Sequence, residues 1–141
     1  MNFRSSIGYL LHELAHLIDA ESDQVLMERL GIGFAQFKVL LVLDDRDEVT
    51  QKHIAESLHQ TEASISRQVA ILKQKGLIQS HRSESNRRQH IISLTSRGAQ
   101  MIDRATTALN SYHGPMFERL SEKQQLQIAE ALNLIRSSIN Q

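Results

Sequence analysis

The 141-residue sequence lacks cysteine and tryptophan and contains a single proline. The absence of cysteine excludes disulfides, thiolate metal sites and a cysteine redox switch. Sixteen basic residues balance sixteen acidic ones, and this zero net charge argues against a nonspecific polyanion binder. Long hydrophobic runs are also missing, because Arg4, His12 and Glu13 interrupt the apolar N-terminal stretch. We therefore expect neither a signal peptide nor a membrane span, but a soluble cytoplasmic protein.

Sequence motifs that carry catalysis are missing as well. The chain shows no Gly-rich phosphate loop, no metal-ligand pattern and no nucleophile motif, so we expect neither an enzyme nor a bound cofactor or metal. His12 and His16 are spaced as two ligands on one helix face could be, but the sequence nominates no third ligand. We favour the interpretation that these are surface or interface histidines.

Charge is unevenly distributed along the chain. Residues 61–97 hold seven lysines or arginines and two acidic residues, a net charge of +5, which leaves −5 for the rest. Such a split indicates that one segment faces an anion while the remainder stays acidic and solvated. The alternative interpretation is chance clustering on a solvated face.

Hydrophobic periodicity predicts helices and one β-hairpin. Thr50, Thr61 and Thr95 are expected to cap helices at their N-termini, and Gly76 to end one at its C-terminus. Gly114–Pro115 is expected to break or kink the fifth helix. The expected helices span residues 5–30, 34–43, 51–58, 62–75, 96–112 and 122–140, and the hairpin strands span 77–83 and 88–94.

This order of elements predicts a mainly α fold of the α+β class. Its centre is a winged helix-turn-helix with a small two-stranded β wing, flanked by long terminal helices. The terminal helices carry apolar stripes that the central unit is too small to cover, so we expect a second copy of the chain to cover them. The alternative is that the two terminal helices pack on each other within one chain. The stripes consist of Leu10, Leu14 and Leu17 and of Leu132, Ile135 and Ile139.

A helix of this kind fits the major groove of DNA, where only its outward face can contact bases. In the helix over 61–75, Ile65, Val69 and Leu72 form the inward stripe, and the helix N-terminus at Thr61 offers N–H groups to a phosphate. The expected outward residues are Ala63, Ser64, Arg67 and Gln68. At the wing over 82–90, Arg88 is expected to enter the minor groove and Arg82 and Arg87 to contact phosphates.

The stretches "IAESLHQTEASISRQVAILKQKGLI" (54–78) and "NRRQHIISLTSRG" (86–98) resemble the MarR family of bacterial winged-helix regulators. The wing pattern of that family is an acid, any residue, an arginine and then Leu-Thr-x-x-Gly. Arg88, Leu94, Thr95 and Gly98 fit this pattern, whereas Asn86 replaces the acid that usually pairs with the arginine. Two further departures are Ser80, where the family often has a basic residue, and His59, where it often has glycine.

The resemblance implies a single domain over 1–141, with the DNA-binding region at 32–98 and helical dimerisation regions at 1–31 and 99–141. It implies a repressor that binds a pseudo-palindromic operator on double-stranded DNA as a homodimer. It also implies a crevice for a small aromatic or phenolic effector, to which we assign His12, His16 and Tyr112. Two other functions stay open: a winged-helix adaptor for an acidic protein partner, and a small-molecule-binding or catalytic protein that has kept only the fold.

Overall fold

The computed structural model describes residues 2–86 and 88–139 and divides into two compact units, Met1–Ala108 and Leu109–Gln141. The boundary between the units falls inside α5, and the expected single domain over 1–141 stays a prediction. A short 3-10 helix over Phe3–Ser5 precedes the other elements. These are α1 (Ile7–Leu30), α2 (Phe34–Asp44), β1 (Val49–Thr50), α3 (Gln51–Leu58), α4 (Glu62–Gln74), β2 (Ile78–Arg82), β3 (His90–Leu94), α5 (Ser96–Phe117) and α6 (Glu122–Ile139).

Three threonines begin helices as the sequence predicts. The Thr50 hydroxyl accepts a hydrogen bond from His53 N, and the Thr61 hydroxyl accepts one from Ser64 N, both at 3.1 Å. The Thr95 hydroxyl accepts from the backbone N–H three residues later, also at 3.1 Å. Each bond satisfies an N–H that has no partner within its own helix, which is why these starts were predictable from local sequence.

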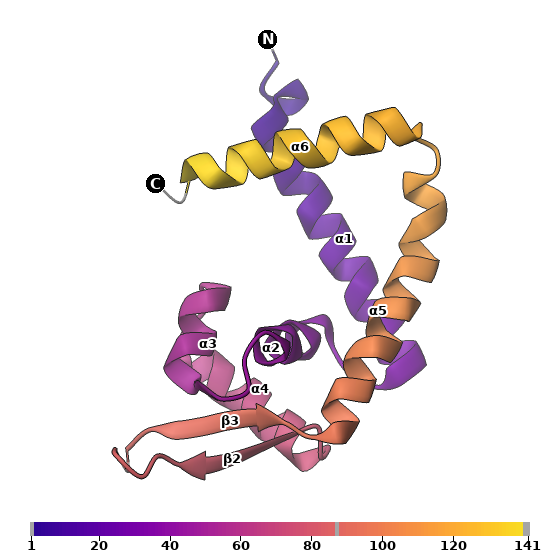
Figure 1. Cartoon of the computed structure of the whole chain (residues 1–141). Helices are drawn as coiled ribbons and strands as arrows, with labels where there is room; N and C mark the ends of the chain where they lie inside the picture. Colours follow the sequence, from indigo (N-terminus) through magenta and orange to yellow (C-terminus); the bar gives the residue numbers. More distant parts are fainter. Residues whose placement is uncertain (1, 87, 140–141) are drawn as a thin grey trace. The chain divides into compact units, whose positions relative to one another are not determined.

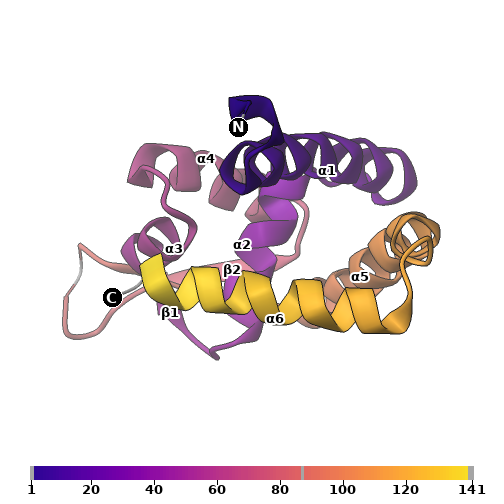
Figure 2. The same cartoon turned by 90° about the horizontal axis from the view of Figure 1, so that it is seen from above.

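The core of the first unit lies where α2, α3 and α4 pack together, with the β2–β3 hairpin beside α4 (Figure 1). Helix α1 packs on α2, and its buried side chains, which include Val25 and Leu26, lie in its C-terminal half (Figure 2 shows the two helices crossing in projection). The fully buried large side chains come from these helices, from β3 and from the loop between α1 and α2, and burying each is worth about 1.5–3 kcal/mol. They are Leu26, Ile32, Val39, Leu40, Ile54, Ile65, Leu72 and Ile92.

The sheet has three antiparallel strands in the order β1-β3-β2, one strand more than the two-stranded wing that the sequence predicts. The wing hairpin itself is confirmed, with a register from Ile78↔Leu94 to Arg82↔His90. The added strand β1 pairs Val49 with Ile92 and Thr50 with Ile91. Strand β1 has only two residues, too few to show the alternating pattern by which a strand is recognised in a sequence. Its partner residues in β3 are separated from it in the chain by the whole helix-turn-helix. The pairing joins the start of α3 directly to the wing.

Helix α5 continues through Pro115 to Phe117, so the expected end near Tyr112 is wrong. Proline lacks an N–H and cannot donate to the carbonyl four residues earlier, but the following turn continues, with Glu118 N bonded to Gly114 O at 2.9 Å. The next helix begins with the predicted capping box. Ser121 N donates to Gln124 Oε1 at 2.9 Å, and Gln124 N donates to the Ser121 hydroxyl at 3.2 Å.

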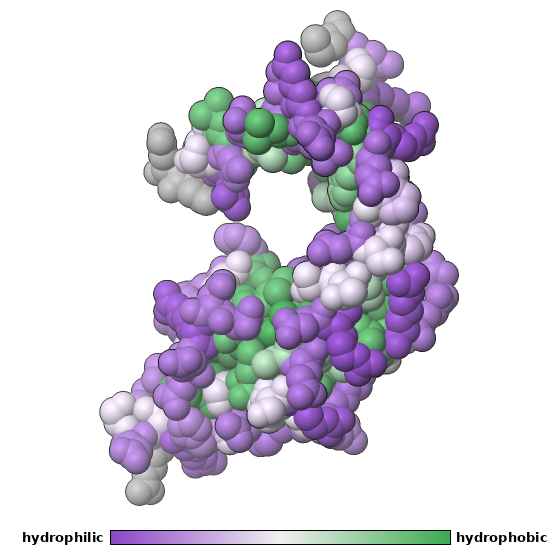
Figure 3. Space-filling model, turned by 45° about the vertical axis from the view of Figure 1, so that its right-hand side comes forward, coloured by the Kyte–Doolittle hydropathy of each residue, from purple (hydrophilic) through white to green (hydrophobic). Residues whose placement is uncertain are grey.

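Within the described residues, α6 has no buried side chain. Figure 3 shows apolar residues at the surface of this helix, at the top of the view, among hydrophilic ones. Leu126, Ile128, Leu132, Leu134, Ile135 and Ile139 are all exposed. Over residues 2–86 and 88–139, no helix combines the length and the apolar character needed to cross a membrane.

Candidate nucleic-acid interface

The turn between α3 and α4 presents α4 at the surface of the first unit. His59 ends α3 in the left-handed conformation, with φ 53° and ψ 43°, and its N–H bonds the Glu56 carbonyl at 3.3 Å. Ile65, Val69 and Leu72 are buried, as predicted, so the opposite face of α4 is outward. Helix α4 thus has the position of the second helix of a helix-turn-helix, the one that enters the major groove.

Four of the side chains expected at DNA lie at the N-cap and in the N-terminal half of α4. Ala63 and Arg67 are exposed on the outward face. The Thr61 hydroxyl serves as the helix cap, and the half-buried Ser64 hydroxyl donates to Gln60 Oε1 at 3.2 Å. Arg67 is the long side chain of this group. It is exposed, and among the described residues it makes no local hydrogen bond of the kind that Thr61 and Ser64 make.

Gln68 lies differently from the sequence expectation. Its side chain is half-buried, and its Oε1 atom is buried with no hydrogen-bond partner among the residues that the structure describes. An unsatisfied buried acceptor costs about 1–3 kcal/mol. A base contact by Gln68 requires the amide to leave this position, and such a contact stays a prediction.

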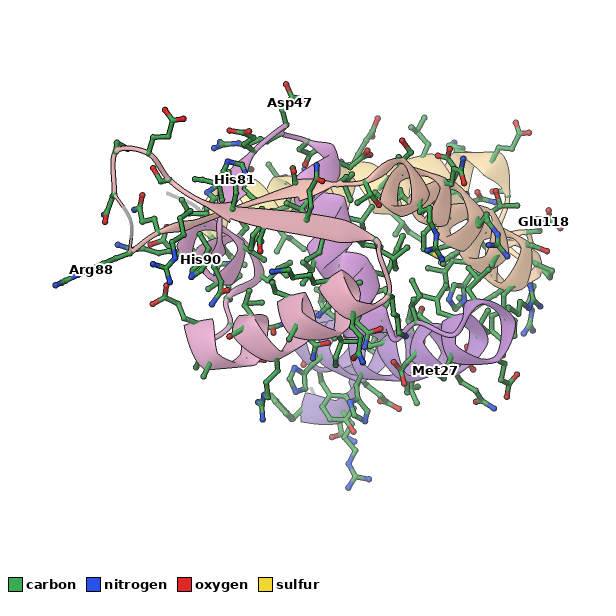
Figure 4. The ribbon with its side chains drawn as sticks, turned by 90° about the horizontal axis from the view of Figure 1, so that it is seen from below. Met27, Asp47, His81, Arg88, His90 and Glu118 are labelled. Atoms are coloured by element: carbon green, nitrogen blue, oxygen red, sulfur yellow. The ribbon has the colours of Figure 1, made fainter. Side chains whose placement is uncertain are left out.

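The wing is a short hairpin whose tip is held by backbone hydrogen bonds. Ser83 N donates to Gln89 O, and Gln89 N donates to Asn86 O, both at 3.0 Å. Arg82 is exposed at the end of β2, and Arg88 is exposed at the tip. Figure 4 shows the Arg88 side chain extending away from the body of the protein. Arg87 lies outside the described residues.

Asn86 organises the backbone of this tip. Its Oδ1 accepts a hydrogen bond from the backbone N–H of Arg88 at 3.1 Å, an Asx-turn, instead of pairing with the guanidinium. The amide that replaces the family's acid thus shapes the loop but leaves the direction of the Arg88 side chain to other contacts.

A tight junction fixes the wing against α4 and α5. The Thr95 hydroxyl donates to Gly76 O at 2.7 Å, and Thr95 N donates to Leu77 O at 3.1 Å. A Cβ added to Gly98 would lie 2.1 Å from the Leu77 carbonyl oxygen, closer than any side chain tolerates. The Leu-Thr-x-x-Gly motif is thereby explained: Thr95 caps α5 and links it to the end of α4, and Gly98 lets the two segments approach.

The structure adds residues that the sequence did not nominate. One pocket joins the start of α3, the start of α4 and the wing, and its lining brings Lys52, Glu62 and His90 together with Arg88. A neighbouring groove between α4 and the sheet is lined in part by Ser66, Lys73 and His90. These neighbours arise from the β1–β3 pairing, and no local sequence pattern announces them.

The three predicted effector residues lie in different units. His12 and His16 are exposed on α1 in the first unit. Tyr112 is 42% exposed in the second unit and makes an edge-on contact with His113, with ring centroids 5.2 Å apart. No group of three metal-binding side chains occurs among the residues described. A shared crevice for these side chains stays a prediction.

Comparison with known proteins agrees with this geometry. The MarR family model matches residues 30–89, from the end of α1 to the wing. The organic hydroperoxide resistance transcriptional regulator of Bacillus subtilis (strain 168) is 30% identical over 102 residues, 68% of this chain and 69% of the relative.

Two solved structures with DNA are similar over nearly the whole chain. The MepR–DNA complex of S. aureus has a TM-score of 0.77 at 25% identity, covering 94% of this chain and 98% of that one. The transcriptional repressor CouR bound to a 23-mer DNA duplex has a TM-score of 0.80 at 26% identity, covering 93% and 92%. CouR from Rhodococcus jostii RHA1 bound to p-coumaroyl-CoA has a TM-score of 0.76 at 23% identity, covering 93% and 92%.

The turn and the outward α4 lie within residues 30–89, which the family model matches, and the chain is also similar to a curated regulator of transcription. The chain belongs to the MarR family of transcriptional regulators.

Proposed function

We propose that this MarR-family regulator is a cytoplasmic homodimeric repressor that binds a pseudo-palindromic operator on double-stranded DNA. One observation carries the proposal: exposed arginines on α4 and on the wing belong to one compact unit. MepR and CouR, which are similar over nearly the whole chain, have been solved with DNA. The proposal divides the chain into a DNA-binding region at 32–98 and helical dimerisation regions at 1–31 and 99–141.

Helix α4 is proposed to read bases in the major groove. The Arg67 guanidinium can donate two hydrogen bonds to a guanine, and the Ala63 methyl can contact a thymine methyl. Ser64 and the N-terminus of α4 at Thr61 would contact a phosphate. Gln68 suits adenine once its amide turns out of this half-buried position.

The wing is proposed to contact the neighbouring minor groove. Arg88 extends from the tip and would enter the groove, where a narrow width concentrates negative potential (Figure 4). Arg82 and Arg87 would neutralise phosphates, which adds affinity without sequence preference. Asn86 would keep the tip in shape through its bond to Arg88 N.

The second copy is proposed to cover the terminal helices. Leu10, Leu14 and Leu17 are each about half exposed on α1, although their spacing is that of a buried stripe. On α6, Leu132, Ile135 and Ile139 are exposed in the same way. Apolar stripes of this size on two helices favour an interface over contact with water.

Release from the operator is proposed to follow binding of a small aromatic or phenolic effector. CouR has been solved both with DNA and with p-coumaroyl-CoA, an aromatic acyl ligand. His12, His16 and Tyr112 are our candidates for the effector crevice, since they supply exposed rings on the helices that flank the DNA-binding region. The proposed role includes no catalysis.

Titration of operator and scrambled duplexes at several salt concentrations tests the proposal, after genomic footprinting has identified an operator. Arg67→Ala should cost roughly 1–3 kcal/mol per half-site and flatten the preference at one base position. Arg88→Ala should weaken binding most at sites with a narrow flanking groove. Arg104→Ala, an exposed arginine on α5 outside the basic segment, is the matched control and should change neither.

Two results would overturn the proposal. If Arg67→Ala and Arg88→Ala change operator and scrambled binding by one common factor, the division between helix and wing is wrong. If the native protein dimerises but binds no genomic DNA, a protein adaptor becomes the better interpretation.

A further inference from the structure

The C-terminal ends of α1 and α4 meet through one lysine side chain. Helix α1 ends at Leu30, followed by Gly31 in the left-handed conformation at φ 70°. Helix α4 ends at Gln74, and Lys75 is its C-cap residue. The half-buried Lys75 reaches across and donates a hydrogen bond from Nζ to the Gly31 carbonyl. The carbonyls at a helix C-terminus carry partial negative charge, so an ammonium between two such ends is favourable to both.

Lys75 therefore differs from the other basic residues of segment 61–97. Lys73 is exposed and lines the groove between α4 and the wing. The ammonium of Lys75 instead donates to a carbonyl oxygen at the C-terminal end of α1.

We propose that Lys75 is a positioning residue that fixes the tilt of α4 relative to α1 and thereby sets the half-site spacing that the dimer prefers. This inference rests on the proposed function, in which α1 contributes to the dimer interface and α4 enters the major groove.

The geometry makes a small tilt consequential. The C-terminal end of α4 is held on one side by the Thr95 hydroxyl on Gly76 O and on the other by Lys75 on Gly31 O. Thirteen residues at 1.5 Å each make α4 about 20 Å long, with Ala63 and Arg67 toward the far end. A tilt of about 10° would move that end by about 3.5 Å, close to the roughly 3.4 Å rise of one base pair. The buried side chains Ile65, Val69 and Leu72 also hold α4, and a tilt of this size on loss of the Lys75 bond would shift the register by about one base pair.

Half-site spacing is the first readout. Binding to operators whose half-sites are one base pair closer, at the natural distance or one base pair farther apart should show an optimum for the native protein. Lys75→Met keeps the aliphatic stem and removes the donor, and it should reduce that discrimination by about threefold or more without changing the salt slope. Lys75→Arg should keep the native profile, and the control Lys73→Met should keep the spacing optimum. A reduced salt slope with an unchanged spacing profile for Lys75→Met would overturn the inference and assign Lys75 to a phosphate.

A second readout does not depend on DNA. The native chain has no cysteine, so Arg29→Cys on α1 and Ala63→Cys on α4 provide the two positions for spin labels in the full-length protein. With labelled chains diluted in unlabelled protein, Lys75→Met should broaden or shift the distance distribution, whereas Lys75→Arg should not. Lys75→Gln repeats the test if the methionine variant does not fold.

An unchanged distance distribution would overturn the inference whatever the protein does with DNA. A native protein that selects no duplex would overturn the proposed function and the spacing role with it, while the label distances would still decide whether Lys75 fixes the tilt of α4.

Discussion

Gly98→Ala places a methyl group where the backbone of the wing passes over the start of α5. The added Cβ would lie 2.1 Å from the Leu77 carbonyl oxygen and 3.0 Å from Leu94 Cδ2. The carbonyl is backbone and cannot rotate away as a side chain could. The segment at Leu77 must therefore move, which disturbs the bond from Thr95 N to the same carbonyl.

The expected free-energy change combines three effects. Overpacking costs about 1–3 kcal/mol. Weakening the bond from Thr95 N to Leu77 O costs about 1 kcal/mol, and the better helix propensity of alanine offsets about 1 kcal/mol. We therefore expect Gly98→Ala to lower the free energy of unfolding by about 2 kcal/mol, which moves a urea midpoint by roughly 1 M.

Equilibrium urea unfolding at one fixed protomer concentration measures this change, since the stability of a dimer depends on concentration. Gly8→Ala is the matched control, because a Cβ at Gly8 on α1 meets no atom within 4 Å, and it should not lower stability. The same urea midpoint for Gly98→Ala and the native protein, with unchanged operator affinity, would refute the close approach at Leu77.

Three further predictions concern the wing tip, the turn and oxidation. Asn86→Asp keeps an acceptor for Arg88 N and adds a charged oxygen that can orient the guanidinium. In titrations, the ratio of operator to scrambled affinity should therefore rise while the affinity for scrambled DNA falls, and equal changes on both duplexes would contradict this. His59→Gly relieves the strain of a left-handed residue at φ 53°, so thermal unfolding should show a gain in stability of about 0.5–1 kcal/mol. A loss of stability would contradict strain at this position. Mild peroxide should cause no rapid, dithiol-reversible loss of DNA binding in a gel-shift assay, because the chain has no cysteine, although one relative is a regulator of organic hydroperoxide resistance.

Most of the fold was predictable because its signals are local. Thr50 and Thr61 begin helices with hydrogen bonds to residues three positions away, and the residue types alone announce such caps. The buried stripe of α4, with Ile65 and Leu72, follows from helical periodicity in the same way. His59 stands where the family often has glycine, and it adopts the left-handed backbone that glycine favours.

The features that escaped prediction depend on residues far apart in the chain. Strand β1 exists because Val49 meets Ile92, and a two-residue strand carries no pattern of its own. The sequence places Lys75 in the basic segment over 61–97. In the structure its ammonium donates a hydrogen bond to Gly31 O, and only the packing of the chain brings this carbonyl close to Lys75. The helical position of Gln68 predicts an outward amide. The Gln68 Oε1 atom is buried instead, because other elements of the fold pack around it.

Strand β1 also has a consequence for how the DNA-binding region folds. The helix-turn-helix brings together neighbours in sequence, whereas the pairing of Val49 with Ile92 closes a loop that contains the whole of α3 and α4. Contacts between distant residues form late because the entropy of loop closure opposes them. The base-reading helix should therefore form early and the wing join it last, so that substitutions at Val49 mainly speed unfolding and leave the folding rate nearly unchanged.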